Sequence, residues 1–401
     1  MYPPKMSKFK TIAQTEMRAI NRSAVLEYLR LAKTASRTEL ANELMISKPT
    51  VMRIVDDLVS DGLIITLDER EKGARRSREL LSLNTSTNLV LGIDIGGSHI
   101  SGIIANIGGE ILYQNRIAIN WSSSEENYQT LVHYMKSLQK EALLYPAKIL
   151  GLAVGVPGII DSKNGIVRIA PSLNWFNFPL LEKLESSFDI PVIVENDVNL
   201  AVLGENWFGN GEGVNNLVMI SIGTGIGSGI ILDGKLHRGY RDSSGEIGYL
   251  LPGVQYLDNQ YPGFGALESL ASCKGIEERA IKILKSTGFD FDGAKVDAAF
   301  VFDQAREGQT WAKNIVNETI DFLSLAVANI CVCFDPELII IGGGISGSVD
   351  MLIAPIQKRL KNVIPFIPRI EGSLLLNNAP LLGAVVRVFQ KCEDYTVVHV
   401  V

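Results

Sequence analysis

One pattern constrains the fold of this chain most: an apolar segment, a glycine-rich turn and then a second apolar segment. This pattern occurs twice in the chain. Residues 89–98 form the first copy and residues 217–229 the second, and a further apolar segment follows each. A short apolar run bounded by glycines is typical of a buried strand that enters a tight turn. Two such copies, far apart in one chain, predict two duplicated α/β halves that hold a nucleotide between them.

Glycine-rich turns let backbone N–H groups approach phosphate oxygens closely. A third glycine cluster follows apolar residues 339–341, where it could line an adenosine pocket. A carboxylate at the end of the first strand could hold Mg²⁺ through water. A tight turn explains any one cluster equally well, so only the three together predict a nucleotide site. Its residues are Asp94, Gly96, Gly97, Ser98, Gly223, Thr224, Gly225, Gly342 and Gly343.

Polar residues between the two copies predict a ligand site. Asn196 and Asp197 follow an apolar strand at 191–194 and begin a helix that continues over 198–206. A carboxamide and a carboxylate that emerge there would lie in the cleft between the halves, where such groups orient a small hydroxylated ligand. Asn174 belongs to the same stretch of chain.

The first ninety residues show a different pattern, that of short amphipathic helices. Apolar residues at helical spacing predict a first helix over 22–33. Ser36 and Glu39 form a capping-box pattern for a second helix. Ser47 caps a third, with Pro49 in its first turn, where a missing N–H costs little. This order of helices is the helix-turn-helix arrangement, whose third helix enters the major groove of DNA.

Basic residues follow on the outward side of the third helix and in the loop behind it. Strands are predicted at 63–65 and 79–83. The basic loop between them is predicted to be a wing that contacts a phosphate backbone or a minor groove. The alternative is a small helical protein-interaction module with a solvated charged loop. The residues predicted to contact phosphates and base edges are Lys48, Thr50, Arg53, Arg75 and Arg76.

The distribution of charge agrees with a DNA-binding head on a different kind of body. The first 90 residues carry 15 Lys and Arg against 11 Asp and Glu, whereas the remainder carries 23 against 33. The four cysteines form no disulfide framework and are expected to be free thiols. The sequence has neither a signal-peptide pattern nor an apolar run long enough for a membrane helix, so the cytoplasm is the expected compartment.

From about residue 88 onward the chain resembles the ROK family of repressors and sugar kinases, which have an actin-like fold with two ribonuclease H-like lobes, as in hexokinase and Hsp70. With the winged helix-turn-helix, the whole chain resembles the repressor branch of that family. The domains are then a tail at 1–20, a winged helix-turn-helix at 21–83, a linker at 84–88 and a two-lobed sugar-binding domain at 89–401. The resemblance is carried by 94–98, 155–158, 195–199, 223–227 and 245–248.

The resemblance also implies roles for individual residues. Asp197 would be the general base that takes a proton from a sugar hydroxyl as that hydroxyl attacks ATP. Hydrogen bonds to other sugar hydroxyls would come from Asn174, Asn196, Glu246 and Glu268. The glycine turns would form the nucleotide site, with ATP and Mg²⁺ as its ligands.

The chain departs from the family at the structural zinc, which one His and three Cys usually hold. Here the corresponding positions are Tyr249, Asn259, Tyr261 and Ala266. None of these supplies the imidazole or thiolate that zinc requires, so the sequence predicts no zinc. The loop would be held instead by packing of Tyr249, Tyr256, Tyr261 and Phe264. Ser98-His99 likewise stands where family kinases have Thr-Lys, and His99 is expected to be a surface or strand residue.

Three functions remain open on the sequence. The first is a regulator, most simply a repressor, whose affinity for operator DNA changes when a monosaccharide or sugar phosphate binds in the cleft. Such a protein is expected to act as a homodimer or a dimer of dimers on a pseudo-palindromic site, away from any membrane. The second is an ATP-dependent sugar kinase that carries a DNA-binding domain. The third is a scaffold with a vestigial cleft. Neither the sugar nor the operator can be read from the sequence.

Overall fold

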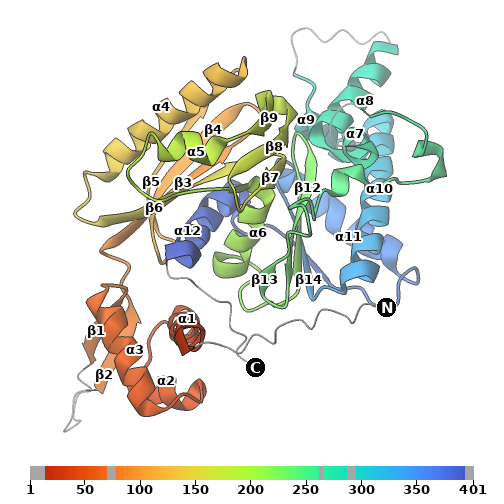
Figure 1. Cartoon of the computed structure of the whole chain (residues 1–401). Helices are drawn as coiled ribbons and strands as arrows, with labels where there is room; N and C mark the ends of the chain where they lie inside the picture. The colour runs from red at the N-terminus through yellow and green to blue at the C-terminus, as the bar shows by residue number, and fades with distance from the viewer. Residues whose placement is uncertain (1–13, 70–77, 262–264, 287–294, 393–401) are drawn as a thin grey trace, which may run out of the picture. The chain divides into compact units, whose positions relative to one another are not determined.

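The computed structural model describes residues 14–69, 78–261, 265–286 and 295–392. The chain divides into two units, one of Met1–Thr87 with Phe389–Val401 and one of Asn88–Val388. Figure 1 shows both, coloured along the chain.

The first unit is a winged helix-turn-helix. Its elements are α1 (Gln14–Ala32), α2 (Arg37–Glu43), α3 (Lys48–Ser60), β1 (Ile64–Glu69) and β2 (Arg78–Leu83). Ser36 and Glu39 form the predicted capping box, and Ser47 caps α3 with Pro49 in its first turn. The strands β1 and β2 pair antiparallel from Ile64 opposite Leu83 to Glu69 opposite Arg78. The apolar sides of all three helices are buried together with the strands.

Three predicted boundaries are corrected by the structure. The first helix begins at Gln14, not at residue 22, so the last seven residues of the predicted tail are helical. Ion pairs join this helix to α3, since Arg18 binds Asp57 and Arg22 binds Asp61. The predicted strand at 63–65 continues to residue 69, and residue 88 of the predicted linker already belongs to β3. Arg75 and Arg76 lie outside the described residues.

The second unit begins with an N-terminal lobe around a five-stranded sheet in the order β10-β6-β3-β4-β5. Helix α4 (Ser124–Ala142) packs on one face of this sheet, and α5 (Leu180–Glu185) lies beside it (Figure 1). Alternate residues of the central strands face opposite sides, and both sides are buried. The strands are β3 (Asn88–Ile95), β4 (His99–Asn106), β5 (Ile111–Ala118), β6 (Lys148–Val156) and β10 (Val192–Asn196). A small separate sheet holds β7 (Ile159–Asp161), β8 (Ile166–Ala170) and β9 (Trp175–Phe178).

The C-terminal lobe repeats the same topology in the order β13-β12-β11-β14-β15. In each sheet the strand that comes first in sequence, β3 or β11, lies in the middle. The two strands on one side of it pair antiparallel, and the two strands on the other side pair parallel. The predicted duplication of the α/β halves is therefore confirmed. The strands are β11 (Leu217–Ile222), β12 (Ile226–Leu232), β13 (Lys235–Leu236), β14 (Leu338–Gly342) and β15 (Arg369–Gly372). The helices of this lobe are α7 (Ala266–Ala271), α8 (Cys273–Ser286), α9 (Ala298–Arg306), α10 (Thr310–Phe334) and α11 (Asp350–Leu360).

Two further helices, α6 (Asp197–Phe208) and α12 (Ala379–Cys392), pack against each other (Figure 1). Each has a glycine at the contact. A Cβ built on Gly204 would lie 2.2 Å from the carbonyl oxygen of Ala379, and one on Gly383 would lie 1.7 Å from that of Leu200. No other residue allows so close an approach. The contact fixes α6, whose first residue is Asp197, against the face of the N-terminal sheet that α4 leaves open.

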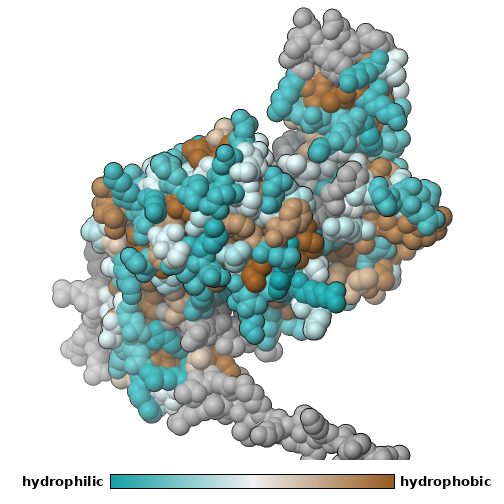
Figure 2. All heavy atoms as spheres, turned by 45° about the horizontal axis from the view of Figure 1, so that its top comes forward, coloured by the Kyte–Doolittle hydropathy of each residue, from teal (hydrophilic) through white to brown (hydrophobic). Residues whose placement is uncertain are grey.

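Helix α10 is long and apolar enough to cross a membrane by length and composition. It is better explained as the core helix of the C-terminal lobe, because Ile320, Leu323 and Val327 are buried in that lobe's apolar cluster. Hydrophilic side chains cover much of the face of the molecule shown in Figure 2, with apolar side chains in separate groups.

Candidate functional site

Four carboxylates from the two lobes form the centre of the candidate site. Asp94 is the last residue but one of β3, and Asp197 begins α6 directly after β10, so both lie at the carboxyl ends of strands in the N-terminal sheet. Gly155 on β6 leaves room for both, since a Cβ there would lie 3.3 Å from Oδ1 of Asp94 and 3.4 Å from Cα of Asp197. Glu246 precedes a short 3₁₀ helix, Ile247–Tyr249, and Glu268 lies in α7, both in the C-terminal lobe.

These carboxylates influence one another electrostatically. Burial, followed by the charge of Asp197, raises the pKa of Asp94 to about 8, and Arg116 opposes this shift. Burial raises the pKa of Asp197 to about 6, although the backbone N–H of Val198 donates to its carboxylate at 3.0 Å. Burial and the charges of Asp197 and Glu268 raise the pKa of Glu246 to about 7. The cluster therefore retains protons near neutral pH, so its members can both donate and accept hydrogen bonds.

Glu268 connects this cluster to the second glycine turn. Its Oε2 accepts a hydrogen bond from the backbone N–H of Ile226 at 3.1 Å. A Cβ on Gly225 would lie 2.6 Å from the same oxygen, which explains why glycine stands there. Glu268, which the resemblance assigned to sugar binding, therefore also supports the second glycine turn, which was assigned to nucleotide binding.

The three glycine turns come together as predicted. A Cβ on Gly97 would lie 3.0 Å from Oγ1 of Thr224, and one on Gly344 would lie 3.3 Å from Cα of Gly223. Gly343 has a φ of +87°, a conformation that favours glycine. The first, second and third turns therefore adjoin in sequence order, and Gly342 ends β14 directly before the third.

The first glycine turn is covered by residues that the sequence did not mark. The indole N–H of Trp121 donates to the carbonyl of Gly96 at 3.0 Å. His99, the first residue of β4 as expected, packs its ring against Gly96 and lies 3.0 Å from a guanidinium nitrogen of Arg116. Arg116 was missed because only the pairing of β4 with β5 brings it near Asp94. Ser98 remains exposed beside this turn.

The two predicted asparagines make structural hydrogen bonds. Asn196 caps α6 by accepting from the backbone N–H of Asn199 at 2.8 Å, and its amide donates to the carbonyl of Gly158 at 2.9 Å. Asn174, in the left-handed region with a φ of 55°, is exposed and donates to the carbonyl of Ser122 at 2.7 Å. Of the two, Asn196 directly precedes Asp197, so its cap orients the carboxylate.

The residues at the family's zinc positions do not fit that metal. The amide of Asn259 donates to the carbonyl of Gln255 at 3.2 Å, the hydroxyl of Tyr261 donates to the carbonyl of Tyr256 at 3.3 Å, and Ala266 is buried. Within the described ranges, no group of three or more His, Cys, Asp or Glu side chains is placed to hold a metal. Hydrogen bonds as well as ring packing hold this loop. The ring of Tyr256 does meet Phe322 edge-on, but Tyr249 is about half exposed, and Phe264 lies outside the described residues.

The predicted DNA-contacting residues of α3 lie on its solvent side. Lys48 and Arg53 are exposed and have no carboxylate partner among the residues that the structure describes. Thr50 is half-buried, and its hydroxyl is hydrogen-bonded to that of Ser47 at 2.7 Å. The two cations are therefore available to a nucleic acid, whereas the threonine hydroxyl mainly supports the helix start.

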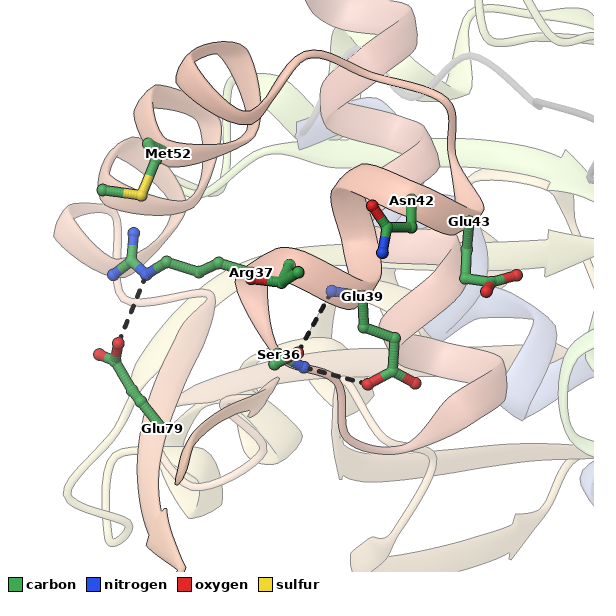
Figure 3. Close-up of a pocket in the computed structure, with 8 residues that line it drawn as sticks. Ser36, Arg37, Glu39, Asn42, Glu43, Met52 and Glu79 are labelled. Carbon is green, nitrogen blue, oxygen red and sulfur yellow. Dashed lines mark hydrogen bonds and ion pairs between the residues drawn. The ribbon is translucent and has the colours of Figure 1, made fainter. Parts of the chain in front are cut away.

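A hollow of about 660 Å³ lies at the corner between α2, α3 and β2 (Figure 3). Arg37 crosses it, 2.6 Å from Asp56 and 3.6 Å from Glu79. Glu39 and Glu43 add two more carboxylates to the lining, and Glu39 closes the capping box. This acidic corner is not part of the predicted sites. Through Arg37 it joins α3 to β2.

Comparison with known proteins agrees with this geometry. The model of the ROK family matches residues 90–391, which is most of the chain. The chain belongs to the ROK family. A model of the MarR family matches residues 20–77, so this ROK protein carries a MarR-type winged helix at its N-terminus.

Individual relatives of this ROK protein include both regulators and kinases. The xylose repressor of Caldicellulosiruptor bescii is 31% identical over 386 residues, which cover 93% of this chain and 96% of the repressor. The crystal structure of a ROK family transcriptional regulator, a homologue of the Escherichia coli MLC protein, has a TM-score of 0.81 at 23% identity and covers 94% of this chain and 98% of that one, which shows the fold. A ROK family glucokinase from Streptomyces griseus, solved with glucose and AMPPNP, has a TM-score of 0.66 at 27% identity and covers 75% of this chain and 99% of that one.

Proposed function

We propose that this protein is a sugar-responsive DNA-binding transcriptional regulator, acting as a repressor of carbohydrate metabolism in the cytoplasm. The observation that supports this most directly is the match to a xylose repressor over both units of the chain, the winged helix included. A kinase requires only the two-lobed unit, as the glucokinase match over 75% of this chain illustrates. The exposed side of α3 that carries Lys48 and Arg53 is the surface that operator DNA would meet.

The effector we propose is a monosaccharide or sugar phosphate bound at Asp197, Glu246 and Glu268. Carboxylates from both lobes would accept hydrogen bonds from sugar hydroxyls, and the protonated ones would donate. Sugar binding alters operator affinity only if the sugar prefers one of two conformations of the protein. As a single helix-turn-helix covers one half-site, we propose a homodimer or dimer of dimers on a pseudo-palindromic operator.

Operator binding in the presence of sugars tests this function. An operator fragment would be selected from random DNA with the purified full-length protein, and its affinity would be measured by gel shift with D-xylose, D-glucose and other monosaccharides in turn. One sugar should weaken binding at least tenfold, and Glu246→Ala should abolish that response while leaving sugar-free binding intact. If every sugar leaves operator affinity unchanged, the proposed function is wrong.

A second candidate function is an ATP-dependent sugar kinase, and the retained nucleotide turns favour it. Asp197, with a pKa of about 6, is suited to accept a proton from a hydroxyl near neutral pH. The three adjoining glycine turns and Asp94 fit ATP and Mg²⁺, which would supply the phosphoryl group when bound. A coupled assay of ADP formation over the same sugars tests this. Turnover that Asp197→Asn lowers by at least a thousandfold would establish the enzyme, and no turnover in the wild type would exclude it.

Arg53→Ala should weaken operator binding by roughly tenfold or more, because Arg53 is exposed on α3 and would lose a charged contact to phosphate or base edge worth about 1–3 kcal/mol. The gel-shift assay measures this change. Lys282→Ala, which removes an exposed cation from α8 in the other unit, is the matched control and should bind normally. Equal affinities for wild type and Arg53→Ala would contradict the proposed docking of α3.

Metal analysis of the purified protein should find no stoichiometric zinc, because Tyr249, Asn259, Tyr261 and Ala266 offer neither thiolate nor imidazole. A chelator should likewise leave the melting temperature unchanged. One zinc per chain would show that other residues have taken over the site.

A further inference from the structure

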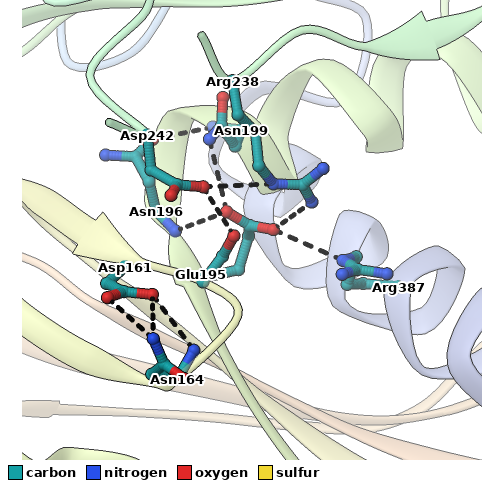
Figure 4. A network of polar contacts seen from close by, with 9 residues as sticks. Asp161, Asn164, Glu195, Asn196, Asn199, Arg238, Asp242 and Arg387 are labelled. Atoms are coloured by element: carbon teal, nitrogen blue, oxygen red, sulfur yellow. Dashed lines mark hydrogen bonds and ion pairs between the residues drawn. The ribbon is translucent and has the colours of Figure 1, made fainter. Parts of the chain in front are cut away.

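A fully buried carboxylate lies directly before the effector residues and is held by two arginines (Figure 4). Glu195, at 1% exposure, accepts from Nη2 of Arg238 at 2.5 Å and from Nε of Arg387 at 3.3 Å. Its other oxygen accepts from the backbone N–H of Asn196 at 3.2 Å and from the amide of Asn199 at 3.3 Å. Burial alone would raise the pKa of Glu195, but the two guanidinium groups outweigh it and hold that pKa below its ordinary value. The carboxylate therefore stays charged at neutral pH.

The partners of Glu195 come from different parts of the two-lobed unit. Glu195 ends β10 in the N-terminal lobe, and Arg387 lies on α12, which packs on the same sheet. Arg238 follows β13 in the C-terminal lobe, at the start of residues 238–245, a segment that we call the strap. A second tie joins the strap to the N-terminal lobe, because the hydroxyl of Ser162, directly after β7, donates to Asp242 at 2.8 Å.

The far end of the strap directly precedes an effector residue. The carbonyl of Gly245 accepts from the backbone N–H of Ser228 on β12 at 2.7 Å and from its hydroxyl at 3.1 Å. Gly245 has a φ of +93°, and a Cβ there would lie 2.0 Å from the carbonyl oxygen of Ser228, so the strap is pressed closely onto β12. The next residue is Glu246. Glu195 likewise precedes Asn196 and Asp197. The network thus joins the segments that present carboxylates from opposite lobes.

The network also contains a contact that is nearly formed. Nε of Arg238 is buried without a hydrogen-bond partner, and Oδ1 of Asp242 lies 3.9 Å from it. A shift of about 1 Å would bring this pair to normal hydrogen-bond distance. Asp242 could then give up its hydrogen bond with Ser162 and accept one from Arg238 instead. That change would loosen one of the two ties between the strap and the N-terminal lobe.

We infer that Arg238 is a positioning residue for the effector, and that the strap, anchored on Glu195 and Ser162, is an interlobe latch that sets the separation of Asp197 and Glu246. Buried ion pairs contribute little net stability, although removing one partner is costly. Their value here lies in geometry, since one carboxylate fixes three segments at once. The role in effector binding rests on the proposed function, whereas the latch itself does not.

Hydrogen exchange and sugar binding on the full-length protein test this together. In Arg238→Met, which keeps side-chain bulk but loses the charge, amides of residues 238–246 should exchange at least tenfold faster than in the wild type. The Kd for D-xylose or D-glucose, whichever the wild type binds, should rise about tenfold. Arg238→Lys should recover part of both losses, because it restores a cation that packing alone would not require. Ser162→Ala, which deletes only the second tie, should show a smaller increase in exchange.

Arg168→Met is the matched control, because Arg168 forms an equally short pair with Asp161 that stays within the N-terminal lobe. It should leave strap exchange and sugar affinity unchanged. Unaltered strap exchange in both Arg238→Met and Ser162→Ala overturns the latch, as does equal behaviour of the Met and Lys variants. If the wild type binds neither sugar, the proposed function is in doubt for these sugars, and the exchange data still decide the latch.

Discussion

Gly383→Ala is expected to destabilise the two-lobed unit by about 3 kcal/mol. The new methyl group would lie 1.7 Å from the carbonyl oxygen of Leu200, an atom of the α6 backbone that cannot rotate away. Relief requires α6 and α12 to separate, which opens the apolar cluster that contains Leu200, Leu381 and Val385. Alanine is intrinsically better than glycine inside a helix by about 1 kcal/mol, so a net loss of stability can only come from the clash.

Thermal and urea unfolding measure this effect, and the melting temperature should fall by roughly 5 °C or more. Gly347→Ala is the control, because a Cβ there meets nothing within 4 Å and the residue does not have a positive φ. Gly204→Ala, whose methyl group would lie 2.2 Å from the carbonyl oxygen of Ala379, should act in the same direction. Wild-type stability of Gly383→Ala would mean that the two helices are farther apart than the structure has them.

The parts of the fold that the sequence predicts best are those set by neighbours along the chain. The capping box of Ser36 and Glu39 and the cap at Ser47 need only residues within one helical turn, and both are present. The strand–turn–strand copies at Gly96 and Gly223 are equally local, and their repetition was sufficient to predict the duplicated sheets. The start of α1 was misplaced because apolar spacing marks only the part of the helix that is buried, whereas residues 17 and 18 of the added part are exposed. The added part is joined to α3 by the ion pair of Arg18 with Asp57.

The candidate site shows the same division. Asp94, Asp197, Glu246 and Glu268 were assigned from motifs. In the structure Asp94 and Asp197 adjoin Gly155, and the charges of Asp197 and Glu268 raise the pKa of Glu246. Which groups surround them was not predictable. Arg116 comes near Asp94 only because β4 pairs with β5. Arg238 and Arg387 bind Glu195 although they lie 43 and 192 residues from it in the sequence. Nothing in the sequence around these arginines marks them, because only the fold places each one near a carboxylate.

Asp94→Asn is expected to stabilise the protein at alkaline pH much more than at acidic pH. The pKa of Asp94 rises from 3.8 to about 8 on folding, because the carboxyl is buried beside Asp197. Between these values the folded chain holds a proton that the unfolded chain has released, so the wild type loses stability as pH rises from about 4 to about 8. A fully shielded group would lose about 1.4 kcal/mol per pH unit. Solvent still reaches part of Asp94 and screens its charge, so the whole range should cost about 2 kcal/mol.

Urea unfolding of the wild type and Asp94→Asn at pH 5 and pH 8.5 measures this difference. Asp197 and Glu246 titrate in the same range, so the comparison between the two proteins isolates Asp94 where either curve alone does not. Asp258→Asn, which removes an exposed carboxylate, should leave the curve parallel to that of the wild type. The curve of Asp94→Asn should instead diverge upward as pH rises. If it also runs parallel, Asp94 keeps its charge in the folded protein, and a cation rather than a proton must balance it beside Asp197.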